Sequence, residues 1–190
     1  MKLAAHLAAL AFVSLSAADA HAVERQWQAG AGLGWARIAR GDFTGSSVGP
    51  TLHLSYGLTD MFNVIAETSH VPVVLRGPLP SGERGELPRT FALQTAAAGV
   101  AYTLDVVRLV PYAGLLVGGA RMSAGQKTIG ALRGTEGVDT RLDLVLALGA
   151  DYHVTRDLAV GAAVRLHEMP GSTSQSAAHV LLRAGYVWGW

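Results

Sequence analysis

The sequence predicts an all-β protein, a transmembrane antiparallel up-and-down β-barrel of eight strands preceded by a signal peptide. Apolar and polar residues alternate with a period of two in eight segments, and no long segment keeps a helical period. Of the 190 residues, 50% are hydrophobic and only 15% are charged, yet no uncharged apolar run is long enough to cross a membrane as a helix. Such a chain fits strands whose outer face is solvated by lipid.

The first 22 residues have the organisation of a secretory signal peptide. Met1-Lys2 is a short positive region, Leu3–Leu15 is almost entirely apolar, and Ala20-His21-Ala22 is an A-x-A cleavage site. Cleavage after Ala22 leaves residues 23–190 as the barrel, and cleavage after Ala20 is the alternative. The sequence therefore predicts two parts, a signal peptide over 1–22 and one barrel domain over 23–190.

The first four predicted strands are the segments 27–35, 48–57, 62–67 and 94–104. In each, one face is apolar and the other is polar or rich in glycine, as expected for a wall with one face toward lipid. The predicted lipid-facing residues are Trp27, Ala29, Ala31, Leu33 and Trp35; Val48, Pro50, Leu52, Leu54 and Tyr56; Phe62, Val64 and Ala66; and Val100, Tyr102 and Leu104.

The other four predicted strands are the segments 109–119, 141–152, 158–167 and 179–190. The sixth segment has the clearest alternation, because leucines alternate with charged and small residues along it. The predicted lipid-facing residues are Ala113, Leu115 and Val117; Leu142, Leu144, Leu146, Leu148 and Tyr152; Leu158, Val160, Ala162, Val164 and Leu166; and Val180, Leu182, Ala184, Tyr186, Trp188 and Trp190.

The predicted connections alternate in length. Long connections are expected over 39–47, 69–89, 120–139 and 168–176, and tight turns after segments two, four and six. Long loops on one side and short turns on the other are typical of the extracellular and periplasmic ends of a bacterial barrel. An even number of strands also returns both termini to the same side.

The last eight residues carry a second, independent signal. Arg183, Gly185, Trp188 and Trp190 stand at the polar, glycine and aromatic positions of a motif that resembles the C-terminal β-signal of bacterial outer-membrane barrels. This resemblance implies recognition by the barrel-assembly machinery, with periplasmic chaperones as partners during biogenesis.

Two short phrases extend this resemblance along the mature chain. They are Tyr56-Gly57-Leu58-Thr59-Asp60 and Pro111-Tyr112-Ala113-Gly114. Together with the alternation they resemble the small OmpA/OmpX-type eight-stranded barrels of the outer membrane protein beta-barrel domain family. The resemblance implies an integral protein of the bacterial outer membrane, surrounded by outer-membrane lipids and lipopolysaccharide.

Aromatic residues on the predicted lipid face are expected to form girdles at the membrane interfaces. Trp27 and Trp35 are eight residues apart, which corresponds to roughly 20 Å across the membrane for a tilted strand. The predicted girdle comprises Trp27, Trp35, Tyr56, Tyr102, Tyr152, Tyr186, Trp188 and Trp190.

Charged residues of both signs fall on the predicted inner face. The lumen of an eight-stranded barrel is just wide enough for side chains to fill it, so these groups are expected to pair and close it. They are Glu67, Arg141, Asp143, Asp151, Arg165 and Arg183. Arg183 is expected to pair with Glu67 or Asp143. A gated pore or a proton path is the functional alternative.

The inward histidines are candidate residues for metal binding and for catalysis. His167 and His179, with Glu168 nearby, offer imidazole and carboxylate ligands, but polar residues at the lumen mouth are the simpler interpretation. A lipid A deacylase needs a Ser two residues after its His, where this chain has Met169, and His53-Leu54-Ser55 lies near a periplasmic turn. We therefore expect no catalytic residue, metal or cofactor.

The resulting functional expectation is a non-enzymatic barrel that contributes to envelope structure or to surface interaction through its extracellular loops. The loop-binding partner is left open. A net charge of +1 argues against a nucleic-acid partner. The alternatives are a narrow pore for small solutes, a lipid A-modifying enzyme, and a secreted soluble barrel that binds an apolar ligand.

Overall fold

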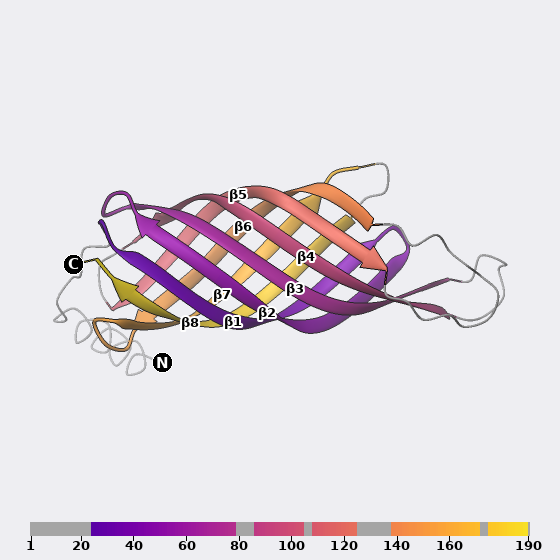
Figure 1. Cartoon of the computed structure of the whole chain (residues 1–190), viewed down its shortest axis with the longest axis horizontal. Helices are drawn as coiled ribbons and strands as arrows, with labels where there is room; N and C mark the ends of the chain where they lie inside the picture. The colour runs from indigo at the N-terminus through magenta and orange to yellow at the C-terminus, as the bar shows by residue number, and fades with distance from the viewer. Residues whose placement is uncertain (1–23, 79–85, 105–107, 125–137, 172–174, 190) are drawn as a thin grey trace, which may run out of the picture.

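The computed structural model describes residues 24–78, 86–104, 108–124, 138–171 and 175–189. They form a closed barrel in which each strand pairs antiparallel with the next and β8 pairs with β1, which confirms the predicted fold class (Figure 1). The strands are β1 (Trp27–Arg40), β2 (Phe43–Gly57), β3 (Phe62–Pro78), β4 (Glu86–Thr103), β5 (Leu109–Ala124), β6 (Val138–His153), β7 (Leu158–Met169) and β8 (Gln175–Trp188). Within these ranges no helix has the length and apolar character needed to cross a membrane. The predicted signal peptide and Trp190 lie outside the described residues.

The barrel has two distinct ends. Trp27 of β1 lies opposite Trp188 of β8, so the first strand begins and the last strand ends at the same place, which we call the terminal end. The opposite end, where β1 connects to β2 and β3 to β4, is the loop end. Figure 1 shows the β3–β4 hairpin extending beyond the other strands at the loop end.

The strands continue further toward the loop end than the sequence predicts. The predicted connection over 39–47 is wrong, because β1 reaches Arg40, β2 begins at Phe43, and only two residues separate them. Gly41 sits in this turn with a φ of 56°, in the left-handed region where glycine is favoured. The small polar residues of early β2 pair with β1 through the backbone, which does not require apolar side chains.

The predicted connection over 69–89 is also largely strand. β3 continues to Pro78 and β4 begins at Glu86, paired along their full length. The inward residues here are Val71, Val73 and Leu75, so the alternation of the inner face persists beyond the predicted strand. The connections predicted over 120–139 and 168–176 are shorter for the same reason, since β5 ends at Ala124, β6 begins at Val138, β7 ends at Met169 and β8 begins at Gln175.

The interior holds two apolar clusters. The one nearer the loop end, which we call the apolar plug, contains Ala36, Ile38, Val71, Val73, Leu75, Leu93, Ala120, Met122, Met169 and Ala177, with Phe43 and Phe91 packed against it. The other lies toward the terminal end and contains Ile65, Ala97, Ala101, Tyr112, Leu116, Val145, Ala147, Ala163 and Leu181. The polar inner residues are distributed around and between these clusters.

Candidate functional site in the lumen and at the loop end

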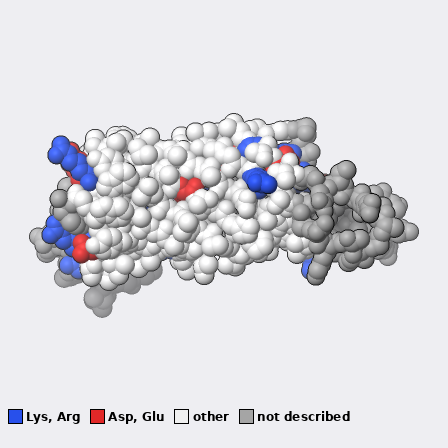
Figure 2. Space-filling view, in the orientation of Figure 1, with Lys and Arg blue, Asp and Glu red and all other residues white. Residues whose placement is uncertain are grey.

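The outer wall is apolar over most of its height. Large hydrophobic side chains are exposed along every strand, including Leu33, Leu115 and Leu182 at 62%, 71% and 68%. Figure 2 shows charged residues gathered mainly near the two ends of the barrel, with a largely uncharged wall between them. On β3 to β5 the loop-side boundary of this band is polar, because His70 lies opposite Gln94 and Gln94 lies opposite Arg121.

The aromatic residues of the predicted girdle lie on the outside, but unevenly. Trp27, Tyr56, Tyr102, Tyr152, Tyr186 and Trp188 lie on the terminal side of the band, and Trp35 lies nearer the loop end. The Trp27 ring centroid lies 4.6 Å from that of Tyr56 and 6.4 Å from that of Trp188. The described aromatic girdle is therefore concentrated at one interface.

The first lumen ion pair joins opposite walls of the barrel. Arg165 of β7 donates from Nε to both carboxylate oxygens of Glu67 on β3, at 2.7 and 2.9 Å, and from Nη2 to the Tyr112 hydroxyl at 3.0 Å. The Arg165 side chain is only 1% exposed. A guanidinium this deeply buried requires such partners, because an unpaired charge away from water is costly.

The second lumen ion pair lies closer to the terminal end. Arg183 of β8 bonds Asp151 of β6 through Nη2 at 2.6 Å and through Nε at 3.0 Å, so its partner is neither of those expected from the sequence, Glu67 and Asp143. Gly161 lies opposite Asp151, and a Cβ at this glycine would collide with the carboxylate. The absence of a side chain on β7 therefore makes room for the pair.

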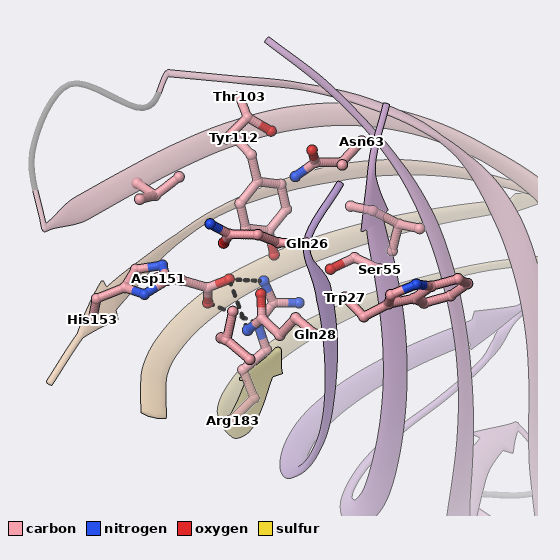
Figure 3. Close-up of a pocket in the computed structure, with 14 residues that line it drawn as sticks. Gln26, Trp27, Gln28, Ser55, Asn63, Thr103, Tyr112, Asp151, His153 and Arg183 are labelled. Carbon is pink, nitrogen blue, oxygen red and sulfur yellow. Dashed lines mark hydrogen bonds and ion pairs between the residues drawn. The ribbon is translucent and has the colours of Figure 1, made fainter. Parts of the chain in front are cut away.

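Figure 3 shows this pair at the edge of a small cavity in the terminal half of the lumen. The cavity measures about 30 Å³, space for a water molecule or two. Gln28 and Arg183 both point at the Asp151 carboxylate in this view, with Gln28 Nε2 at 3.5 Å. A second cavity, of about 20 Å³, lies between His53, Glu67 and the residues around His179.

The two inward histidines of β7 and β8 lie together. His167 and His179 have ring centroids 4.5 Å apart, although they are offset by two positions, since His179 lies opposite Arg165. His167 Nδ1 bonds Asp143 Oδ2 at 2.9 Å. Glu168 points outward and is exposed, so it does not join them. No group of three or more His, Cys, Asp or Glu side chains in the described part of the chain could hold a metal ion.

Arg141 lies apart from the central pairs, at the loop-end mouth of the lumen. Its Nε and Nη2 contact Asp139 Oδ2 at 3.0 and 2.8 Å, and Arg40 of β1 reaches the same oxygen with Nη2 at 2.9 Å. Arg40 Nη1 also lies 3.2 Å from Met122 Sδ, on top of the apolar plug. We call Arg40, Asp139 and Arg141 the mouth cluster.

Sequence reasoning missed several of these residues. Tyr112 and His53 lie on the faces opposite the predicted lipid-facing residues, but only charged residues are predicted to fill the lumen, and Arg40 and Asp139 lie in the predicted connections 39–47 and 120–139. An inward Arg at the end of a strand, opposite a strand that begins with Asp-x-Arg, was the available signal for the mouth cluster.

The residues of β8 that resemble a β-signal divide between the two faces of the wall. Arg183 and Gly185 point into the lumen and Trp188 points outward. The polar position of the motif therefore also takes part in a lumen ion pair.

Comparisons with known proteins agree with this architecture. Residues 5–186 match the family model described as the outer membrane protein beta-barrel domain. The chain belongs to this family. It is therefore an integral protein of the bacterial outer membrane, and its apolar wall faces lipid. A comparison with the curated proteins gave no match.

Several solved barrels share the fold. OprG from Pseudomonas aeruginosa has a TM-score of 0.67 at 12% identity, over 88% of this chain and 98% of that chain. Neisserial surface protein A has a TM-score of 0.63 at 17% identity, over 86% and 97%. The attachment invasion locus protein Ail of Yersinia pestis, in complex with the heparin analogue sucrose octasulfate, has a TM-score of 0.61 at 13% identity, over 87% and 99%. The chain thus spans nearly the full length of these small outer-membrane barrels.

Proposed function

We propose that this family member is a non-enzymatic, non-conducting barrel that contributes a contact surface at the outer face of the membrane. The observation that carries the proposal is the filling of the lumen. Ion-paired side chains occupy its middle, the apolar plug occupies its loop-end part, and the two cavities named above measure only about 30 and 20 Å³.

The geometry of the lumen argues against an acyl-transfer enzyme. The Ser69 and Thr95 hydroxyls bond each other at 2.8 Å, and His167 is held by Asp143. These groups are buried beside the 20 Å³ cavity, which is too small for a lipid acyl chain. A contact role is favoured instead by the extension of the β3–β4 hairpin beyond the barrel and by the charged loop end. The structure of Ail in complex with sucrose octasulfate is an example of a barrel of this fold with a bound sulfated ligand.

The surrounding partners follow from the membrane location. We propose outer-membrane lipids and lipopolysaccharide around the wall, and the barrel-assembly machinery and periplasmic chaperones during biogenesis, through the motif on β8. No cofactor, metal or nucleic acid is part of the proposal.

Planar-bilayer recording tests whether the barrel is closed. The mature chain, refolded and inserted, is expected to give no ohmic conductance above the bare bilayer, because the apolar plug fills the loop-end part of the lumen among the described residues. A general porin inserted in the same bilayer serves as the positive control. Reproducible unitary conductance steps from this protein would refute the closed barrel and favour the narrow-pore alternative.

A further inference from the structure

An open groove, which we call the wall groove, lies on the lipid-facing side of the barrel over β2 to β5. It measures about 560 Å³, within the size range of clefts that hold small ligands. Its floor is formed by Ala66, Ala96 and Ala98, with Leu52 and Leu54 of β2 on one side and Val117 of β5 on the other. The outer face of β3 and β4 is therefore hollowed within the apolar band of the wall.

The wall groove offers an apolar surface to its contents. The Thr68 hydroxyl, opposite Ala96, donates to the Thr95 carbonyl at 2.8 Å, and Glu67, which also lines the groove, forms its ion pair inside the lumen. Gly119, on the other side of Ala96, extends the hollow toward the loop end. A Cβ at Gly119 would meet no described atom closer than 3.8 Å, so packing within the described protein does not require a glycine there.

A polar row lies on the loop side of the wall groove. His70, Gln94 and Arg121 are exposed at the same level of β3, β4 and β5, one outward position beyond the groove, which corresponds to about 7 Å along a strand. The ladder neighbours of Arg121 are Gln94 and Thr140, both neutral, and no described acidic side chain forms an ion pair with it. Figure 2 shows basic side chains at the loop-end edge of the uncharged wall. A cation therefore stands next to an apolar groove at the edge of the lipid-facing band.

We propose that the wall groove and Arg121 form a binding site for one molecule of lipopolysaccharide, with an acyl chain of its lipid A in the groove and a phosphate on Arg121. A guanidinium fork suits phosphate oxygens, and basic sites at a membrane boundary bind lipid head groups. His70 and Gln94 can bond the hydroxyl and amide groups of the lipid A saccharide. Lipopolysaccharide is the occupant because the polar row lies at the loop-side boundary of the band. The inference rests on the proposed outward position of the loop end and gives the proposed lipopolysaccharide contact a defined place.

Native mass spectrometry of the refolded mature chain in detergent, titrated with lipid A, tests the site. The wild type is expected to retain one lipid A. Arg121→Gln, and Ala96→Leu together with Ala98→Leu, which fills the groove floor, are each expected to lower the retained fraction at least fivefold. Arg37→Gln on the outer face of β1 and Ala162→Leu on the outer face of β7 are matched controls, since both residues are exposed outside the site. Each control is expected to change the retained fraction less than twofold.

Further arms separate the contributions of charge and shape. Arg121→Lys keeps the charge and is expected to retain part of the binding, dephosphorylated lipid A is expected to bind at least fivefold more weakly, and heat-modifiable gel mobility shows that each variant is folded. Equal binding of phosphatidylethanolamine, an equal loss in Arg37→Gln, undiminished binding after the groove is filled, or a lipid-free dimer of the barrel that the filled groove abolishes would each overturn the site. Planar-bilayer conductance is a separate measurement, because a closed barrel can lack a lipid A site and a conducting barrel can have one.

Discussion

At the scale of single residues, the lumen has an unequal charge balance. Three carboxylates, Glu67, Asp143 and Asp151, face two guanidiniums, Arg165 and Arg183. Two of the carboxylates each pair with a buried arginine, whereas Asp143 bonds the imidazole of His167. The three acids are therefore expected to differ in what they contribute to stability.

Replacing each lumen acid by its amide tests this difference. Asp151→Asn and Glu67→Gln leave a buried guanidinium without its carboxylate and are expected to cost about 3–5 kcal/mol of unfolding free energy. Asp143→Asn keeps an oxygen that can accept from His167 and is expected to cost about 1 kcal/mol or less. Urea unfolding in lipid vesicles, followed by tryptophan fluorescence, gives the three values. Equal losses of unfolding free energy in Asp143→Asn and Asp151→Asn would contradict the unequal roles of the two carboxylates.

At the scale of elements, the seam between β2 and β3 is the least complete part of the described wall. The two strands pair from Gly57 with Asn63 to Thr51 with Ser69, and again at Thr44 with Arg76, but residues 45–50 and 70–75 form no ladder pairs across the seam. Pro50 and Pro72 lie in these stretches, and proline has no N–H to donate. The gap begins at the level of His70, where the wall turns polar, so water or lipid headgroups can satisfy the backbone.

Amide exchange measured by NMR in detergent micelles tests the seam. Backbone N–H groups of residues 45–49, 70, 71 and 73–75 that point toward the neighbouring strand of the seam are expected to exchange at least tenfold faster than N–H groups of the same strands that point to β1 or β4. The latter serve as internal controls. Pro50→Val together with Pro72→Val restores two donors and is expected to slow this exchange. Protection of the seam equal to that of the β1–β2 ladder in the wild type would contradict the interpretation.

At the scale of the whole molecule, the described part of the lumen contains two filled zones in series, and the proposed closed barrel makes each of them a barrier. In the ion-paired zone, charged side chains pair across the barrel, and in the apolar plug, hydrophobic side chains pack against one another. Water and ions must cross both zones, so opening only one is not sufficient for conduction.

Variants that weaken each zone separately and together test this arrangement. Leu93→Ala with Met122→Ala removes bulk from the plug, and Glu67→Ala with Arg165→Ala removes a complete ion pair without leaving either charge unpaired. Neither double variant is expected to conduct in planar bilayers, whereas the quadruple variant is expected to show small unitary steps. Conductance in the plug variant alone would mean that the ion-paired zone is not a barrier.

The sequence alone determined the strand number, the antiparallel order and the orientation of the wall. In lipid every backbone group must pair within the protein, which a closed barrel of strands achieves. Every second residue of such a strand faces lipid, so apolar residues recur at that spacing over the whole band, as in Leu142, Leu144, Leu146 and Leu148. The strand extensions toward the loop end escaped prediction, because the wall there no longer faces a uniform apolar solvent. Small and polar residues such as those of early β2 form strands without an alternating outer face.

Only the tertiary structure decided which charged side chains of the lumen pair with each other. Alternation shows that Glu67, Asp151, Arg165 and Arg183 point inward, but strand stagger and tilt determine which of them meet across the barrel. The same stagger brings Arg40 of β1 to Asp139 of β6, a contact between residues 99 positions apart. The alternation with a period of two specifies whether a side chain points into the lumen or outward. Its position along the barrel axis, and therefore its partner, is specified only when the barrel closes.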